Sequence, residues 1–140
     1  MSISVRFMAL SDAHYFLTQV SSLPRTLSAV ERKNRFMTAV VFLSWVGLEA
    51  AVVDELRRCR NAGLGSEPPN RRLRDRVAFL LQAKNQPFDQ AAFDRLRRVR
   101  NELAHPSGFG GHAPDSALAS ETFEYCLGIV RAFYPYQIHL

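Results

Sequence analysis

The sequence predicts an all-α fold, in which residues 1–140 form a single helical domain built as an antiparallel bundle of about five helices. Apolar residues recur at helical spacing along most of the chain, and no run of alternating apolar and polar residues is bounded by hairpin turns. Glycine and proline gather between these patterns, at 61–70 and 105–114, where they favour loops.

Two long helices are expected in the first half of the chain. The first has an apolar face formed by Phe7, Leu10, Leu17 and Val20. It should end at Leu23 and Pro24, because proline disfavours helical geometry in the residue before it. Ser28 and Glu31 have the spacing of a capping box, so the second helix should begin there and run to about Arg60.

Three shorter helices should follow the loop at 61–70. Their apolar faces are formed by Leu73, Val77, Leu80 and Leu81, then by Ala92, Leu96, Val99 and Leu103, and then by Ala119, Phe123, Leu127 and Val130. The fourth helix should begin near Pro87. The fifth should begin at Asp115 or Ser116, either of which can serve as the N-cap, and end before Pro135.

The second helix is apolar on almost every side, so it must be surrounded. Its apolar residues include Val40, Val41, Phe42, Leu43, Trp45, Val46, Leu48 and Val52. Either the rest of the chain covers this helix, or a second copy covers part of it. Glu49 interrupts one apolar stripe. Its carboxylate is expected either to be buried beside a cation, for which arginine is the obvious candidate, or to face solvent.

Charge and composition narrow the classes of partner. The net charge of +5 comes almost entirely from arginine, since the only lysines are Lys33 and Lys84. Arginine forms planar, bidentate contacts with phosphate, so a polyanionic partner is one interpretation and a merely basic surface is the other. Cys59 and Cys126 form no metal-binding or disulfide pattern, which indicates a reducing cytoplasm.

No membrane segment or secretory signal is expected. The N-terminal sequence has no uninterrupted apolar stretch followed by a small-residue cleavage site. The most apolar stretch, 39–53, is shorter than the roughly 20 residues needed to span a bilayer and contains Glu49. We therefore expect that stretch to be part of a buried helix.

The arginines of the fourth helix differ in direction. With about 100° of rotation per residue, Arg97 falls on the flank of the apolar arc and Arg98 on the solvent side. Arg100 falls inside the arc. An arginine turned toward the core costs free energy unless its guanidinium is paired or opens into a cleft. The position of Arg100 therefore suggests a structural or a chemical role.

His105 should stand at the end of the fourth helix, because Pro106 moves it away from helical geometry. Histidine gains and loses a proton near neutral pH, so an imidazole at this place suits proton transfer or a phosphate contact. The alternative is that His105 only caps the carbonyl groups of its own helix.

Arg100, Asn101, Ala104 and His105 give the pattern Arg-Asn-x-x-Ala-His at the end of this helix. The pattern resembles the Arg-x(4–6)-His signature of the HEPN superfamily. Arg98 also has the bare spacing, but Arg100 has the neighbouring asparagine and the inward position. The motif covers about six residues, and the helix order extends the resemblance loosely over most of the chain.

The resemblance implies a metal-independent endoribonuclease of toxin or antiviral systems, without a cofactor, in which two copies dimerise around one cleft. His105 would be the proton-transfer group, Arg100 the phosphate clamp and Asn101 an orienting residue. We add Glu49 as a supporting residue and Arg97 as an RNA-binding residue. The expected partners are RNA, a second copy of the chain and an antitoxin or defence-system protein. The expected products carry 2′,3′-cyclic phosphate and 5′-hydroxyl ends.

The spacing of the motif favours a site shared between two chains. Arg100 and His105 lie five positions apart, about 140° around an ideal helix, so one undistorted helix does not aim both at one phosphate. Unwinding at Pro106 or an arginine from a partner must close the gap. Ser107 stands where toxins paired with nucleotidyltransferase antitoxins usually have tyrosine, and His112 is a further candidate for the same cleft.

Two other functions remain open. A non-catalytic HEPN-like assembly module would use its apolar second helix to bind a partner, with Arg100 serving only to neutralise Glu49. A DNA-binding regulator would use Arg57, Arg58 and Arg60 together with the arginines of 71–76, although no helix-turn-helix spacing joins them.

Overall fold

The computed structural model describes residues 5–20, 22–24, 26–63, 71–105 and 114–135. These ranges contain five helices and no strand: α1 (Val5–Val20), α2 (Leu27–Asn61), α3 (Leu73–Ala83), α4 (Gln90–Ala104) and α5 (Ser116–Phe133). The predicted all-α class with about five helices is therefore confirmed. The end of α2 lies one residue beyond the predicted Arg60.

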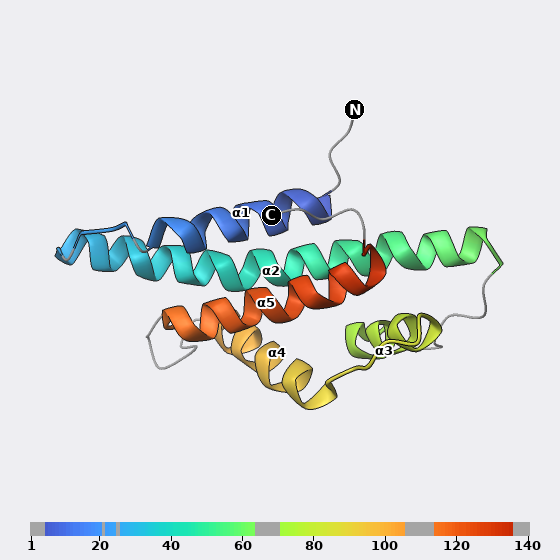
Figure 1. The fold of residues 1–140 in the computed structure, drawn as a ribbon. Coiled ribbons are helices and arrows are strands. Elements are labelled where there is room, and N and C mark those ends of the chain that lie inside the picture. The colour runs from blue at the N-terminus through green and yellow to red at the C-terminus, as the bar shows by residue number, and fades with distance from the viewer. Residues whose placement is uncertain (1–4, 21, 25, 64–70, 106–113, 136–140) are drawn as a thin grey trace.

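All four other helices pack against α2, which runs through the length of the molecule (Figure 1). The helix α1 lies antiparallel along one side of α2. The helix α5 also lies along α2 and contacts α1. It runs in the same direction as α2, because the shorter α3 and α4 bring the chain back before α5 begins. The helix α4 is inclined to α2 and α5, and its C-terminal end lies near the start of α5.

Most of the apolar surface of α2 is buried by the other helices of the same chain. The side chains of Val40, Val41, Trp45, Leu48 and Val52 are almost fully buried. One stripe is covered less well: Val46 and Val53 remain 42% and 48% exposed, and Phe42 lies on the same face in a half-buried position. The chain therefore surrounds most of this helix and leaves one partly apolar edge.

The length and hydropathy of α2 meet a general criterion for a membrane-spanning helix. Its most apolar window has a mean hydropathy of 2.0, and half of that window is buried inside the bundle. The central helix of a packed domain meets the same criterion, so this property is weak evidence for a membrane.

The helix caps correct one sequence prediction. Thr26, and not Ser28, is the N-cap of α2, because the Thr26 hydroxyl accepts a hydrogen bond from the backbone N–H of Ala29. The prediction of a Ser28–Glu31 capping box was therefore wrong. The prediction for α5 is confirmed at Asp115, whose carboxylate accepts from the Leu118 N–H. In each case the cap is the residue at which the backbone is still extended.

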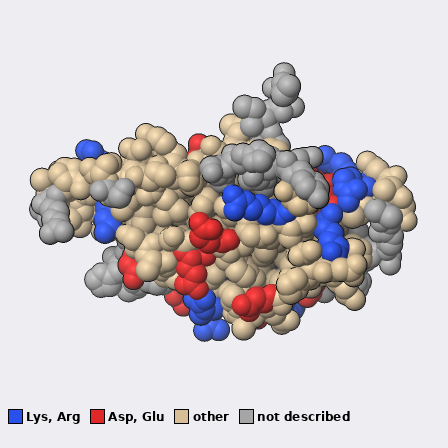
Figure 2. Space-filling model, in the orientation of Figure 1, with Lys and Arg blue, Asp and Glu red and all other residues tan. Residues whose placement is uncertain are grey.

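Basic side chains concentrate where α2 ends, as the right-hand side of Figure 2 shows. One of them, Arg58, donates to the buried carboxylate of Glu55 at 2.6 Å, and Lys84 at the end of α3 reaches the same oxygen at 2.8 Å. Glu55 is only 1% exposed. Burial by itself raises its pKa, but hydrogen bonds and positive charge from Arg58 and Lys84 lower the pKa below its usual value.

This buried ion cluster predicts a pH-dependent contribution to stability. Because the folded-state pKa of Glu55 is lowered, its contribution is present above the unfolded-state pKa of about 4.3 and is lost as the pH falls through the folded-state value. Glu55→Gln should lower the free energy of unfolding by about 1–3 kcal/mol at neutral pH, with a smaller difference from wild type in acid. Urea unfolding, followed by the fluorescence of the single tryptophan, measures both values.

Glu124→Gln, on the exposed side of α5, serves as the control and should change the free energy of unfolding much less. An effect of Glu55→Gln that stays the same from neutral pH to about pH 3 would contradict the proposed ionic contribution.

Candidate active site

The position of the candidate site is set by an aromatic contact between α4 and α2. Phe93 and Leu96 are buried on the inner side of α4, and the Phe93 ring meets Trp45 edge-on with centroids 5.2 Å apart. Asp89 caps the start of α4 through the N–H of Ala92. These contacts fix both the direction and the rotation of α4, so its last two turns lie beside the partly exposed edge of α2.

Arg97 lies on Trp45 and forms an ion pair with Glu49. Its guanidinium carbon is 4.9 Å from the centre of the indole, and Nη1 is 2.8 Å from Glu49 Oε1. Nη1 is buried and makes no well-aligned hydrogen bond, so the contact with Glu49 is ionic in character. The Glu49 side chain is 42% exposed, which is intermediate between the buried and the solvent-facing positions considered from the sequence.

Glu49 is paired with Arg97 and not with Arg100, which corrects the pairing expected in the assembly-module interpretation. The reason is the direction of α4 across α2. Arg100 contacts Phe42 of α2. Arg97, about one turn earlier on α4, contacts Trp45 and Glu49, which lie farther along α2. Neutralising Glu49 is therefore not the role of Arg100.

Arg100 is half-buried, as expected from its position on the helical wheel. Its guanidinium carbon lies 5.7 Å from the centre of the Phe42 ring, a distance that allows a cation–π contact. Its Nε is buried without a hydrogen-bond partner, and its only hydrogen bond among the described residues is a long one of 3.4 Å to Asn101 Oδ1. Arg100 thus lies against Phe42 and has N–H groups that donate no hydrogen bond to the described residues.

His105 follows the last residue of α4 in an extended conformation, with φ −81° and ψ 145°. Its backbone N–H donates to the carbonyl of Glu102, and the residue as a whole is exposed. The imidazole makes no hydrogen bond within the described parts of the chain. The helix end is therefore closed by the backbone of His105, which leaves the side chain available. Pro106, Ser107 and His112 lie outside the described residues.

The predicted residues are brought together in two groups. Arg100, Asn101 and His105 share the last turns of α4, while Arg97 and Glu49 are joined by their ion pair between α4 and α2. Within the described residues, Arg100 and His105 form neither a hydrogen bond nor an ion pair with each other. The two residues of the Arg-x(4–6)-His pattern are thus close along α4, and no direct bond joins them within the described part of one chain.

Two aromatic residues at this site were not identified as functional candidates from the sequence. Phe42 and Trp45 support the guanidinium groups of Arg100 and Arg97. The sequence marks both as apolar residues of the second helix. Only the packing of α4 on α2 shows that they also hold cations.

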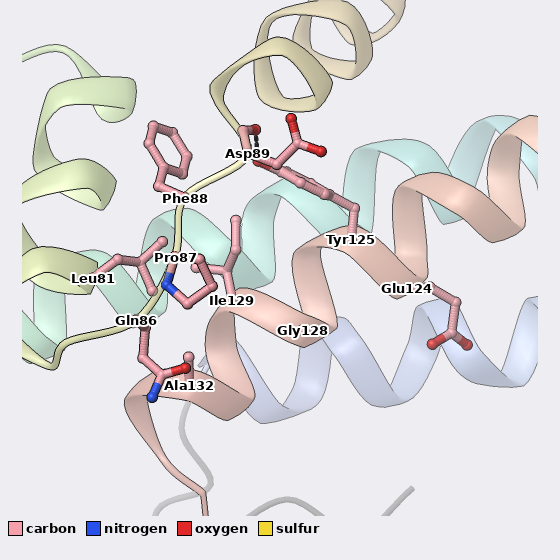
Figure 3. Close-up of a pocket in the computed structure, with 10 residues that line it drawn as sticks. All are labelled: Leu81, Gln86, Pro87, Phe88, Asp89, Glu124, Tyr125, Gly128, Ile129 and Ala132. Carbon is pink, nitrogen blue, oxygen red and sulfur yellow. Dashed lines mark hydrogen bonds between the residues drawn. The ribbon is translucent and has the colours of Figure 1, made fainter.

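A separate cavity of about 380 Å³ lies between α5 and the link from α3 to α4 (Figure 3). Its walls include Leu81, Phe88 and Ile129, and the Tyr125 hydroxyl donates to the Asp89 carbonyl at 2.8 Å. The charged side chains along this cavity are acidic, Asp89 and Glu124. It therefore does not suit a phosphate-bearing ligand.

Among the residues that the structure describes, no group of three or more histidine, cysteine, aspartate or glutamate side chains could hold a metal ion. Comparisons with protein-family models, with curated proteins and with solved structures gave no match to this chain. The class defined by the fold and the site is thus an all-α helical bundle with an arginine and a histidine at the end of one inclined helix.

The contact of Arg97 with Trp45 and Glu49 predicts a measurable contribution to stability. Arg97→Met should lower the free energy of unfolding by about 1 kcal/mol, because the ion pair and the cation–π contact are lost while most of the apolar stem remains. The exposed Arg98→Met variant is the matched control and should stay within about 0.5 kcal/mol of wild type. Urea unfolding distinguishes the two, and equal effects of both substitutions would contradict this assignment.

Proposed function

We propose that this chain is a homodimeric, metal-independent endoribonuclease of the HEPN type, which acts in the cytoplasm as a toxin or antiviral effector. The observation that supports it most is the state of the two motif residues. Arg100 contacts Phe42 and has donors that no described residue uses, and the exposed His105 at the end of the same helix has no side-chain hydrogen bond to a described residue. A phosphodiester would supply the acceptors that both side chains lack.

The chemistry requires only groups of this kind. The 2′-oxygen of a ribose loses its proton and attacks the adjacent phosphorus, the bond from phosphorus to the 5′-oxygen breaks, and the departing oxygen takes up a proton. The Arg100 guanidinium would stabilise the negative charge on the phosphorane, and His105 would transfer protons. Asn101 would hold Arg100 in place through its side-chain oxygen. The products are a 2′,3′-cyclic phosphate and a 5′-hydroxyl.

A dimer would supply what one chain lacks. Two copies of the motif facing one cleft would allow Arg100 of one copy to act with His105 of the other, which gives two equivalent Arg100–His105 sites per dimer. The exposed valines Val46 and Val53 lie on the same face of α2 as Phe42, next to α4. Contact between copies along this edge would bury these side chains and bring the two motifs together.

Single-stranded RNA is the proposed substrate, and Arg97 would contribute to binding it. The net charge of +5 favours association with a polyanion. Arg97 is 25% exposed and already paired with Glu49, so Glu49 would tune its attraction for phosphate. An antitoxin or another protein of a defence system would control the activity.

The assembly-module interpretation is supported by the same exposed valines, but it gives no role to the donors of Arg100 that the described residues leave unused. The two functions differ in one result, namely whether purified protein cuts RNA.

We expect purified protein to cleave single-stranded RNA in the presence of EDTA and to leave cyclic phosphate ends. His105→Ala and Arg100→Ala should each reduce the rate about 10²–10⁴-fold, the usual contribution of a proton-transfer or charge-stabilising group. Arg98→Ala is the matched control, since Arg98 has the bare motif spacing but is exposed on α4. The expected rate of Arg98→Ala is close to that of wild type.

Circular dichroism and thermal melting verify that each variant is folded. The endoribonuclease assignment fails if wild-type protein binds varied RNAs and leaves all of them intact, and the assembly module is then the better interpretation.

The shared site predicts that two inactive variants complement each other. In a mixed dimer of Arg100→Ala and His105→Ala, one site would contain Arg100 from one chain and His105 from the other. An equal mixture, dissociated and reassociated, should therefore recover about a quarter of wild-type activity by random pairing. If mixing restores nothing while mass spectrometry shows mixed dimers, the two residues do not act across the interface.

A further inference from the structure

A second cavity, of about 310 Å³, lies where α2, α3 and α4 meet. Its lining includes Glu49, Val52 and Val53 of α2, Arg76 of α3, Arg97 of α4, and Arg71 just before α3. We propose that this cavity is a phosphate-binding site for a nucleotide or an RNA strand, separate from the motif residues Arg100 and His105.

Positive charge exceeds negative charge in this cavity. Among the described residues, three arginines line it against one carboxylate, that of Glu49, which is engaged by Arg97. Within the described residues, the guanidinium groups of Arg71 and Arg76 form no ion pair. Arginine is the side chain that best matches phosphate, because its planar group can donate two parallel hydrogen bonds.

Among the described residues, the neighbouring Arg74 of α3, unlike Arg71 and Arg76, is paired with carboxylates. Arg74 lies 3.5 Å from Asp94 of α4 and 3.8 Å from Asp75, so its charge is compensated within the fold. Arg71 and Arg76 lie along the cavity instead. Arg74 therefore forms a structural contact between helices, whereas Arg71 and Arg76 keep the cavity electropositive.

The size and the walls of the cavity suit more than a bare phosphate ion. Its volume is at the lower end of the range of about 300–1,000 Å³ typical of small-ligand sites. Val53 is 48% exposed and Leu73 is half-buried, so an apolar surface lies beside the arginines. A ribose or base attached to the phosphate would pack on that surface.

The cavity is well placed to hold a strand that also reaches the motif. Arg97 precedes His105 by eight residues, about 12 Å along the axis of α4. A phosphate bound between Arg71, Arg76 and Arg97 would thus lie upstream or downstream of the one at Arg100 on the same strand. That RNA is the source of the phosphate rests on the proposed function, whereas the phosphate site itself does not.

The test uses the full chain and a double variant, Arg71→Gln with Arg76→Gln. Two probes distinguish the sources of phosphate: a fluorescent 2′-O-methyl oligouridine, which lacks the nucleophile for cleavage, and uridine 5′-monophosphate. Anisotropy gives the affinity for the oligonucleotide over a series of salt concentrations, and calorimetry gives the affinity for the mononucleotide. Arg32→Gln with Arg131→Gln is the matched control, because it removes the same charge from exposed positions on α2 and α5.

If the cavity holds a phosphodiester, the double variant should bind the oligonucleotide at least about tenfold more weakly, with a salt dependence lower by about 1.4 in the log–log slope. The control pair should change less. If the cavity holds a free nucleotide, the loss should appear with uridine 5′-monophosphate instead. In either case Glu49→Gln should tighten binding, because it removes the only negative charge that the described residues contribute to the cavity lining.

The phosphate site is refuted if the folded double variant matches the control pair with both probes. The result is independent of catalysis, since neither probe can be cleaved. A chain that binds as expected but cuts no RNA would retain the phosphate site and lose only the proposed ribonuclease function.

Discussion

The need to bury the middle of a 35-residue helix, which is apolar there on almost every side, determines where the other helices lie. The helices α1 and α5 extend along α2 and cover much of its surface, while α3 and α4 are shorter and cover only parts of what remains. The edge marked by Val46 and Val53 is left partly exposed. The candidate site lies beside this edge because Phe93 anchors α4 on Trp45.

The same packing gives the arginines different roles. Arg58 neutralises a buried carboxylate, Arg95 pairs with Glu121 on α5, and Arg74 links α3 to α4. These cations bridge neighbouring helices at the surface or compensate a buried negative charge. Arg100 instead stacks on an aromatic ring with unused donors, and Arg76 lines a cavity without an ion pair among the described residues. The net charge of +5 therefore does not show where on the molecule positive charge is available to a partner.

Periodicity was sufficient to predict the fold class and the approximate extent of the helices, because burial of one face leaves a regular pattern in the sequence; α1 ends at Val20, before the predicted Leu23, and α4 begins at Gln90, after the predicted Pro87. It also placed Arg100 toward α2, since the direction of a side chain on a single helix follows from its position. Contacts between side chains of different helices could not be predicted in this way. The pairing of Glu49 with Arg97 and the support of Arg100 by Phe42 depend on how α4 crosses α2, which no single-helix pattern contains.

Two further features were missed for the same reason. Glu55 lies in a sequence with many charged neighbours and looks exposed, yet Lys84 from the end of α3 meets it inside the fold. Thr26 caps α2 because the chain is still extended there, although Ser28 offers the more familiar sequence spacing. Local chemistry predicted that α2 needs a cap, and the path of the backbone decided which hydroxyl provides it.

The proposed function requires that Arg100 and His105 act together on one phosphodiester. A crystal structure of the chain with a 2′-deoxy dinucleotide, which keeps the phosphodiester and lacks the attacking hydroxyl, would test this claim most directly. The phosphate should accept hydrogen bonds from the Arg100 guanidinium, with a His105 imidazole of either copy within hydrogen-bond distance of one of its oxygens. A dinucleotide bound elsewhere, with Arg100 still stacked on Phe42 and His105 in solvent, would contradict it.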